Sequence, residues 1–170
     1  YAISTRGLLP APHELGHTYP AFADELKPMT RITDMLKAVR RHIKVAESDG
    51  SNWRAVIDSL RPATPELWLN LPLPEKRHFK QHLSRYWNVA RHRMPAEVAA
   101  ILDEMQASGR LEILKGRLTD ITHDGAKFVV KYKTTQASNN VEADALVNCI
   151  GSESSFSKVD SEFVRNLIAR

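Results

Sequence analysis

The sequence has little of what marks several protein classes. Cys149 is the one cysteine among 170 residues, so no disulfide can form within the chain. No apolar run approaches the roughly 20 residues that cross a bilayer, and no basic segment followed by an apolar one indicates a signal peptide. These absences favour the reducing cytoplasm and exclude a membrane segment. We expect Cys149, which lies in an apolar run, to be a buried and unreactive thiol.

A glycine motif is also missing. No G-x-G-x-x-G occurs, although such glycines normally follow the first strand of a dinucleotide-binding fold. Yet residues 144–151 are nearly all apolar and end on Gly151. That pattern predicts a strand covered on both faces, with an open backbone position for a ligand at its carboxyl end. Because the chain begins on Tyr1, within an expected strand, we expect a fragment of a larger protein.

Basic residues are concentrated in one segment. Residues 76–93 contain six Lys or Arg, three His and no acid, whereas the net charge of the whole chain is +4. Such a cluster indicates an anionic ligand or surface. Its aromatic residues fall at the spacing of a helix core, so we do not expect nucleic acid as the partner.

Residues 28–109 predict a helical insertion subdomain of about five helices. Apolar residues recur there at intervals of three and four, and prolines or capping hydroxyls precede the segments. The expected starts are Thr30, Trp53, Thr64, Pro74 and Pro95. Residues 1–27 are expected to form a strand remnant and an extended connecting loop, because prolines interrupt residues 8–28.

Residues 110–170 predict the β-rich closing part of a nucleotide-binding domain with a C-terminal helix. After Gly109 the apolar period changes from 3.6 to two, which is typical of strands. His123-Asp124-Gly125 predicts a hairpin turn, residues 136–140 and 152–157 predict polar loops, and residues 159–169 predict a helix. The fold class is therefore α/β, or α+β for the fragment, with a partial Rossmann-like domain.

His13-Glu14-Leu15-Gly16-His17 matches H-E-x-x-H, in which two histidines on one helix face bind zinc and the glutamate acts as base. Pro12 and Pro20 leave too little room for that helix, and no third ligand follows at the expected spacing. We therefore expect no metal site, and a zinc hydrolase stays an alternative.

Arg91, His92 and Arg93 lie directly before the expected helix start at Pro95. Two guanidiniums and an imidazole beside helix-terminal N–H groups can hold a carboxylate or phosphate. A basic loop that forms only an internal ion pair explains the same residues, and the sequence leaves both interpretations open.

Four segments, spread from residue 3 to residue 151, carry a family likeness. Residues 3–13 read I-S-T-R-G-L-L-P-A-P-H, close to the pattern I-S-R-R-G-x-L-P-x-x-H. Residues 53–68 and 86–94 are similar to a helical insertion, and residues 144–151 to a closing strand that usually ends in Cys-Thr-Gly or Ala-Thr-Gly. In these segments the chain resembles bacterial FAD/NAD(P)-binding oxidoreductase-like flavoproteins.

The resemblance implies site residues. The residues it implies for cofactor binding are Ser4, Arg6, Gly7, Asn148 and Gly151. The residues it implies for a substrate or another anion are His13, Tyr86, Arg91, His92 and Arg93. Thr5 departs from the pattern, because it replaces an arginine and lowers the positive charge available to a phosphate. No catalytic residue is implied.

Our leading hypothesis is that the parent protein is an FAD- and NAD(P)-dependent oxidoreductase acting on a small, anionic substrate. The fragment alone is then inactive and binds FAD or NAD(P) weakly or not at all, since the pyrophosphate cradle belongs to the remainder of the parent chain. The main alternative is a non-catalytic helical module that uses residues 76–93 to bind nucleic acid or another anionic partner.

Overall fold

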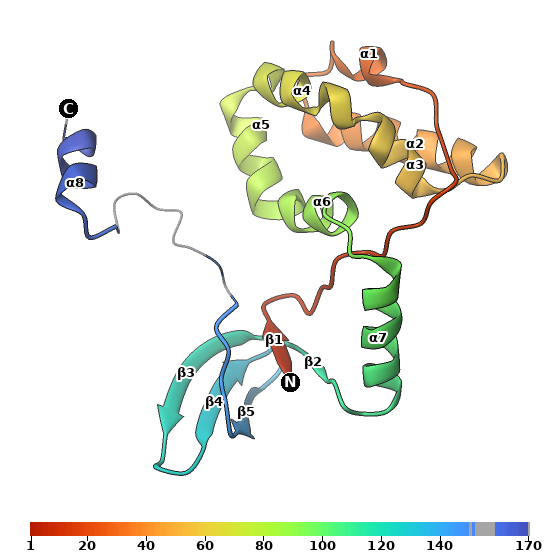
Figure 1. The fold of residues 1–170 in the computed structure, drawn as a ribbon. Coiled ribbons are helices and arrows are strands. Elements are labelled where there is room, and N and C mark those ends of the chain that lie inside the picture. The colour runs from red at the N-terminus through yellow and green to blue at the C-terminus, as the bar shows by residue number, and fades with distance from the viewer. Residues whose placement is uncertain (150, 152–158, 170) are drawn as a thin grey trace. The chain divides into compact units, whose positions relative to one another are not determined.

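The computed structural model describes residues 1–149, 151 and 159–169. The chain divides into two compact units, Tyr1–Lys115 and Gly116–Arg170. Helices dominate the first unit and strands the second, so the expected α+β class of the fragment is confirmed (Figure 1).

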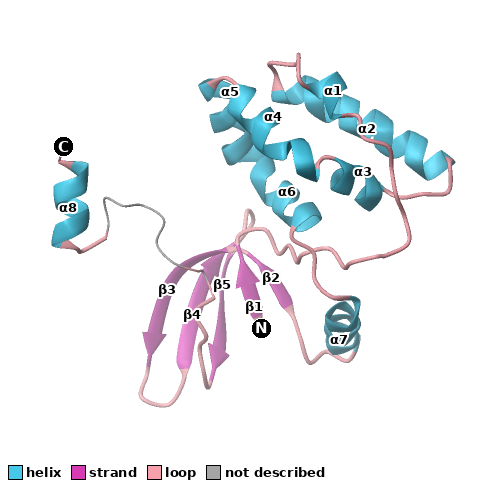
Figure 2. Cartoon of the chain, turned by 45° about the horizontal axis from the view of Figure 1, so that its top comes forward, coloured by secondary structure: helices cyan, strands magenta, loops and turns pink. Residues whose placement is uncertain are grey.

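The first unit consists of two short strands and a series of helices between them (Figure 2). Its elements are β1 (Ala2–Ser4), α1 (Ala23–Leu26), α2 (Ile32–Ser48), α3 (Trp53–Ser59), a 3-10 turn (Arg61–Ala63), α4 (Thr64–Asn70), α5 (Leu73–His78), a π-helical turn (Phe79–Leu83), α6 (Ser84–Arg91), α7 (Ala96–Ala107) and β2 (Ile113–Lys115). The predicted helices are confirmed within a few residues. Helix α1 was not predicted, because it forms inside the proline-interrupted connection.

Two predicted helix caps are wrong. Helix α2 begins after Arg31 rather than Thr30, and its first N–H donates at 2.8 Å to the Glu75 carboxylate of α5. Thr64 is the first residue of α4, and its hydroxyl donates back to Leu60 O at 2.8 Å. Asn52 does cap α3 by accepting from two backbone N–H groups. A cap supplied by a distant helix leaves no local sequence signal.

The core of the first unit lies among α1, α2, α3 and α4. Leu26 and Val56 are its largest fully buried side chains. Met35, Leu60 and Leu67 pack in the same cluster, and Trp68 and Phe79 are in edge-to-face contact at its margin, with ring centroids 5.5 Å apart. The apolar stripes predicted from the 3.6-residue period therefore do face one another.

Strands β1 and β2 form a parallel pair, with Ala2 opposite Ile113 and Ser4 opposite Lys115. All of the helices from α1 to α7 lie between these strands in the sequence. The strand expected at residues 1–5 is thus confirmed, and the helical block is an excursion between two neighbouring parallel strands.

The second unit contains an antiparallel sheet in the order β3 (Arg117–His123), β4 (Phe128–Lys133) and β5 (Ser138–Ala143), and a helix α8 (Glu162–Ile168). The predicted hairpin is confirmed: Asp124 Oδ1 accepts from the N–H groups of Ala126 and Lys127, each at 2.8 Å. Those two backbone donors, Lys127 first, lower the pKa of Asp124 below its ordinary value. The polar loop expected at 136–140 is shorter, since β5 begins at Ser138.

The prediction of a buried strand at residues 144–151 is wrong for residues 144–149. They belong to neither sheet, Val147 is 82% exposed, and Cys149 is exposed rather than buried. A strand covered on both faces needs strands beside it, and β1 pairs with β2 instead of with this run. Ile150 and the expected loop at 152–157 lie outside the described residues.

Candidate functional site

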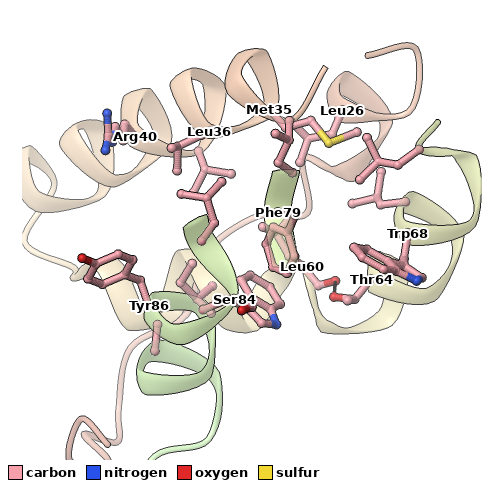
Figure 3. A pocket seen from close by; sticks show the side chains of 18 of the residues that line it. Leu26, Met35, Leu36, Arg40, Leu60, Thr64, Trp68, Phe79, Ser84 and Tyr86 are labelled. Carbon is pink, nitrogen blue, oxygen red and sulfur yellow. Dashed lines mark hydrogen bonds between the residues drawn. The ribbon is translucent and has the colours of Figure 1, made fainter. Parts of the chain in front are cut away.

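The helical block contains a cavity of about 570 Å³. Its walls come from α2, α3, α4, the π-helical turn and α6, and nearly all of the lining side chains are apolar. Figure 3 shows Met35, Leu60 and Phe79 around the interior, with Trp68 at one end. Small-molecule sites span roughly 300–1,000 Å³ and are mostly apolar with a few polar groups, so this cavity has the size and character of a ligand site.

Charge is confined to the rim of the cavity, where it is positive. Arg40 of α2 and Lys80 of the π-helical turn are the charged lining residues, and both are exposed. Tyr86 of α6, which is 55% exposed, lies at the same end of the cavity as Arg40 (Figure 3). Of the residues implied for substrate binding, Tyr86 is the one that lines this cavity.

The π-helical turn forms part of the cavity wall. Helix is continuous from Leu73 to Arg91, and the wider turn at Phe79–Leu83 interrupts its regular geometry. Phe79, Lys80 and Leu83 of that turn all line the cavity. Single π turns inside α-helices occur frequently at functional sites, and no sequence pattern predicted this one.

A second candidate site lies where β1 and β2 end. The Ser4 hydroxyl accepts from Gly7 N–H at 3.0 Å, and Gly7 has a left-handed φ of +62°. A Cβ on Gly7 would lie 3.2 Å from Lys115 Cβ, so the turn passes close over the end of β2. Arg6 and Lys115 are both exposed here. The carboxyl ends of parallel strands are the usual ligand edge of α/β sheets.

Lys115 was not predicted as a site residue. It lies opposite Ser4 because β1 and β2 are parallel and in that register. Lys115 is a second exposed cation at this edge, in addition to Arg6. Only the strand pairing reveals it, since the two residues are more than a hundred positions apart in the sequence.

Asn148 and Gly151, the other two residues implied for cofactor binding, belong to the second unit. Gly151 has a left-handed φ of +82°, and a Cβ added to it would meet nothing within 4 Å. The role of Gly151 in cofactor binding stays a prediction, because the buried strand that was expected to lead to it is not formed by residues 144–149.

Arg93 binds a carboxylate of its own chain. Its side chain is 1% exposed, and its Nη2 forms an ion pair with Asp58 of α3. Arg61 binds the same carboxylate at 2.9 Å. Of the two interpretations left open by the sequence, the internal ion pair is the one that describes Arg93, so this guanidinium is not presented to a ligand.

Backbone contacts hold His13, Arg91 and His92 around the end of α6. Arg91 and His92 end α6, where His92 N–H donates to Asn88 O at 2.9 Å. His13 N–H donates to Met94 O at 2.8 Å, which ties the connecting loop to the end of α6. The side chains of His13 and His92 are exposed.

Residues 13–17 are not helical, so the H-E-x-x-H pattern does not present two imidazoles on one helix face. Glu14 is instead paired with Arg54 at 2.8 Å and with His17 at 3.5 Å. Throughout the described part of the chain, no three His, Cys, Asp or Glu side chains gather where they could ligate a metal ion.

The sequence also did not predict a hydrogen-bonded network of three side chains. Tyr19 Oη lies 2.8 Å from His42 Nδ1, and His42 Nε2 lies 2.9 Å from Glu25 Oε2. His42 stacks on Phe22 with ring centroids 3.8 Å apart. The hydrogen bond from His42, followed by that from Arg41, lowers the pKa of Glu25 below its ordinary value. None of these residues lines the cavity, and the network fastens the connecting loop to α2.

No protein-family model, curated protein or solved structure matches the chain. In residues 1–149, 151 and 159–169, no helix has both the length and the apolar character that crossing a membrane requires.

Proposed function

We propose that the chain is part of an FAD- and NAD(P)-dependent oxidoreductase. In this proposal β1 and β2 belong to the nucleotide-binding sheet, and α1 to α7 form an insertion on the substrate side. The observation that supports it most is the parallel pairing of β1 with β2 around the helical excursion. Parallel neighbours require a crossover connection, and the ligands of such sheets bind beyond their carboxyl ends.

The residues at that edge suit an anionic cofactor group. Arg6 and Lys115 are exposed cations, and Gly7 keeps the backbone free of a side chain above β2. A phosphate of FAD or NAD(P) would be held by these two cations and by N–H groups of the turn. The cofactor, when bound, supplies hydride transfer, and the chain positions it.

The remainder of the parent chain is the required partner. It would contribute the glycine motif that cradles the pyrophosphate, so the 170-residue chain alone holds the cofactor weakly or not at all. The substrate is a small molecule on the side of the helical block, and the location is the cytoplasm.

The test is the cofactor content of the full-length protein. We expect flavin absorbance bands after purification or after addition of FAD, and oxidation of NADH or NADPH by that protein. Replacing both Arg6 and Lys115 by Gln removes two charged contacts and is expected to weaken cofactor affinity about tenfold. Lys127→Gln, in the β3–β4 hairpin, is the matched control and leaves the affinity unchanged. A full-length protein that takes up no flavin contradicts the proposal.

A further inference from the structure

We propose that the cavity of the helical block binds an amphipathic anion of the medium-chain carboxylate class. The nucleotide site plays no part in this inference, because the binding requires no flavin and involves only residues between Leu26 and Ala90. Failure of one proposal would therefore leave the other standing.

The interior of the cavity indicates an apolar body for the ligand. Leu36 and Val39 of α2, Leu60 after α3 and Leu83 of the π-helical turn line it from facing sides. The space of about 570 Å³ is partly open to solvent and leaves room between apolar side chains of several helices. An unbranched chain can fill such a space while covering apolar surface on several helices at once.

The rim indicates the charge of the ligand. Arg40 and Lys80 come from different helical segments, and both border the apolar space. Among residues 1–149, 151 and 159–169, no carboxylate forms an ion pair with either side chain. Arg41, the neighbour of Arg40, is by contrast paired with Glu25. Two cations beside an apolar cavity favour an anion and disfavour a cation of the same shape.

The rim also indicates how the ligand is oriented. Arg40 and Tyr86 lie at one end of the cavity, and Trp68 lies at the other (Figure 3). The carboxylate is thus placed beside Arg40, with the Tyr86 hydroxyl as a neighbouring donor, and the hydrocarbon chain extends toward Trp68. This arrangement makes the carboxylate replaceable by other anionic headgroups, but not by an ammonium group.

Tryptophan fluorescence can report binding in the 170-residue chain. Trp68 and Trp87 line the cavity, whereas Trp53 does not. In a Trp53→Phe variant all of the signal comes from the two lining residues. Titration with decanoate is expected to give a saturable change. Affinity should rise about fourfold per added methylene from octanoate to decanoate, the factor that corresponds to burying one methylene.

Two pairs of variants test the two parts of the site. Ala90 lines the cavity, so Ala90→Phe fills it and is expected to weaken decanoate binding at least tenfold; Ala100→Phe, on exposed α7 surface, should have no effect. Arg40→Gln with Lys80→Gln is expected to weaken decanoate binding about tenfold and decanol binding not at all. Lys44→Gln with Arg77→Gln removes two cations that do not line the cavity and serves as the control.

Several results would overturn the proposal. One is the absence of a saturable signal in the unsubstituted chain, which needs no variant to fold. Another is equal affinity for decanoate, decanol and decyltrimethylammonium, because the cations would then select nothing. A third is a dimer in sedimentation that decanoate does not dissociate, since the occupant would then be a second copy of the chain.

Discussion

The helical block and the β3–β5 sheet differ in how they bury apolar residues. Val130 and Tyr132 are the buried apolar residues of the sheet, whereas all the others in the described part of the chain lie between Phe22 and Leu71. Leu118 and Ile121 of β3 remain 47% and 40% exposed. The helical block therefore carries its own core, while the apolar face of the sheet is buried at β4 and half exposed at β3. Three strands alone are near the lower limit of independent stability.

The largest expected difference between the two regions comes from matched leucine truncations. Leu26 is 1% exposed, so Leu26→Ala should lower the free energy of unfolding by about 3 kcal/mol, the cost of a cavity in a packed core. Leu118→Ala should cost less than about 1 kcal/mol. Thermal unfolding followed by circular dichroism measures both. Equal effects would break the comparison, because the two regions would then share one evenly packed core.

Two arginine substitutions compare a buried and a more exposed arginine within the helical block. Arg93→Ala removes a buried guanidinium and leaves Asp58 with Arg61 alone. Because the Asp58 side chain is 43% exposed, we expect a loss of about 2 kcal/mol rather than the larger cost of a fully buried pair. Arg91→Ala should stay within about 0.5 kcal/mol. Urea unfolding checks both values, and a costlier Arg91→Ala would reverse their assigned roles.

Glycine substitutions test the turn above β2. Gly7→Ala forces a side chain into a left-handed backbone position and against Lys115, so it should cost about 1.5 kcal/mol. Gly125 has a φ of +99° but open space around it, and Gly125→Ala should cost about 1 kcal/mol. Urea unfolding measures the free energy of unfolding of each variant. The difference between the two losses is the contribution of the close approach of Gly7 to Lys115. No difference would mean that Lys115 simply moves aside.

The smallest expected effect is the pH dependence contributed by Glu25. Its pKa is lowered in the folded chain, first by His42 and then by Arg41. The carboxylate therefore stabilises the fold above the ordinary pKa of 4.5, and this stabilisation is lost as the pH falls through the lower folded value. The stability gap between the unsubstituted chain and Glu25→Gln should thus narrow below about pH 4.5. Acid titration followed by circular dichroism measures this stability gap. A gap that widens below about pH 4.5 would contradict the prediction.

The sequence predicted the order of the elements because periods of 3.6 and two residues are local signals. Helices α2 to α7, strand β1 and the hairpin at Asp124 followed from them. Features made by distant residues could not be predicted: Glu75 capping α2, Asp58 binding Arg93, and Lys115 beside Ser4.

Residues 144–151 also show that distant neighbours decide what a local pattern cannot. Their apolar composition predicts a buried strand, yet residues 144–149 pair with no strand. Composition reports what a segment can bury, whereas the available neighbours decide whether it does. The cavity could not be predicted from the sequence for a similar reason. Its lining residues have the spacing of an ordinary helix core, and only the arrangement of the helices leaves space between them.

Hydrogen exchange of the 170-residue chain, with and without decanoate, tests most directly whether the helical block is the self-supporting, ligand-holding region. We predict slower exchange in α2 to α6 than in β3 to β5, and a further slowing with decanoate that is confined to α2 to α6. Slower exchange in the sheet, or a decanoate effect of the same size in both regions, would contradict this claim.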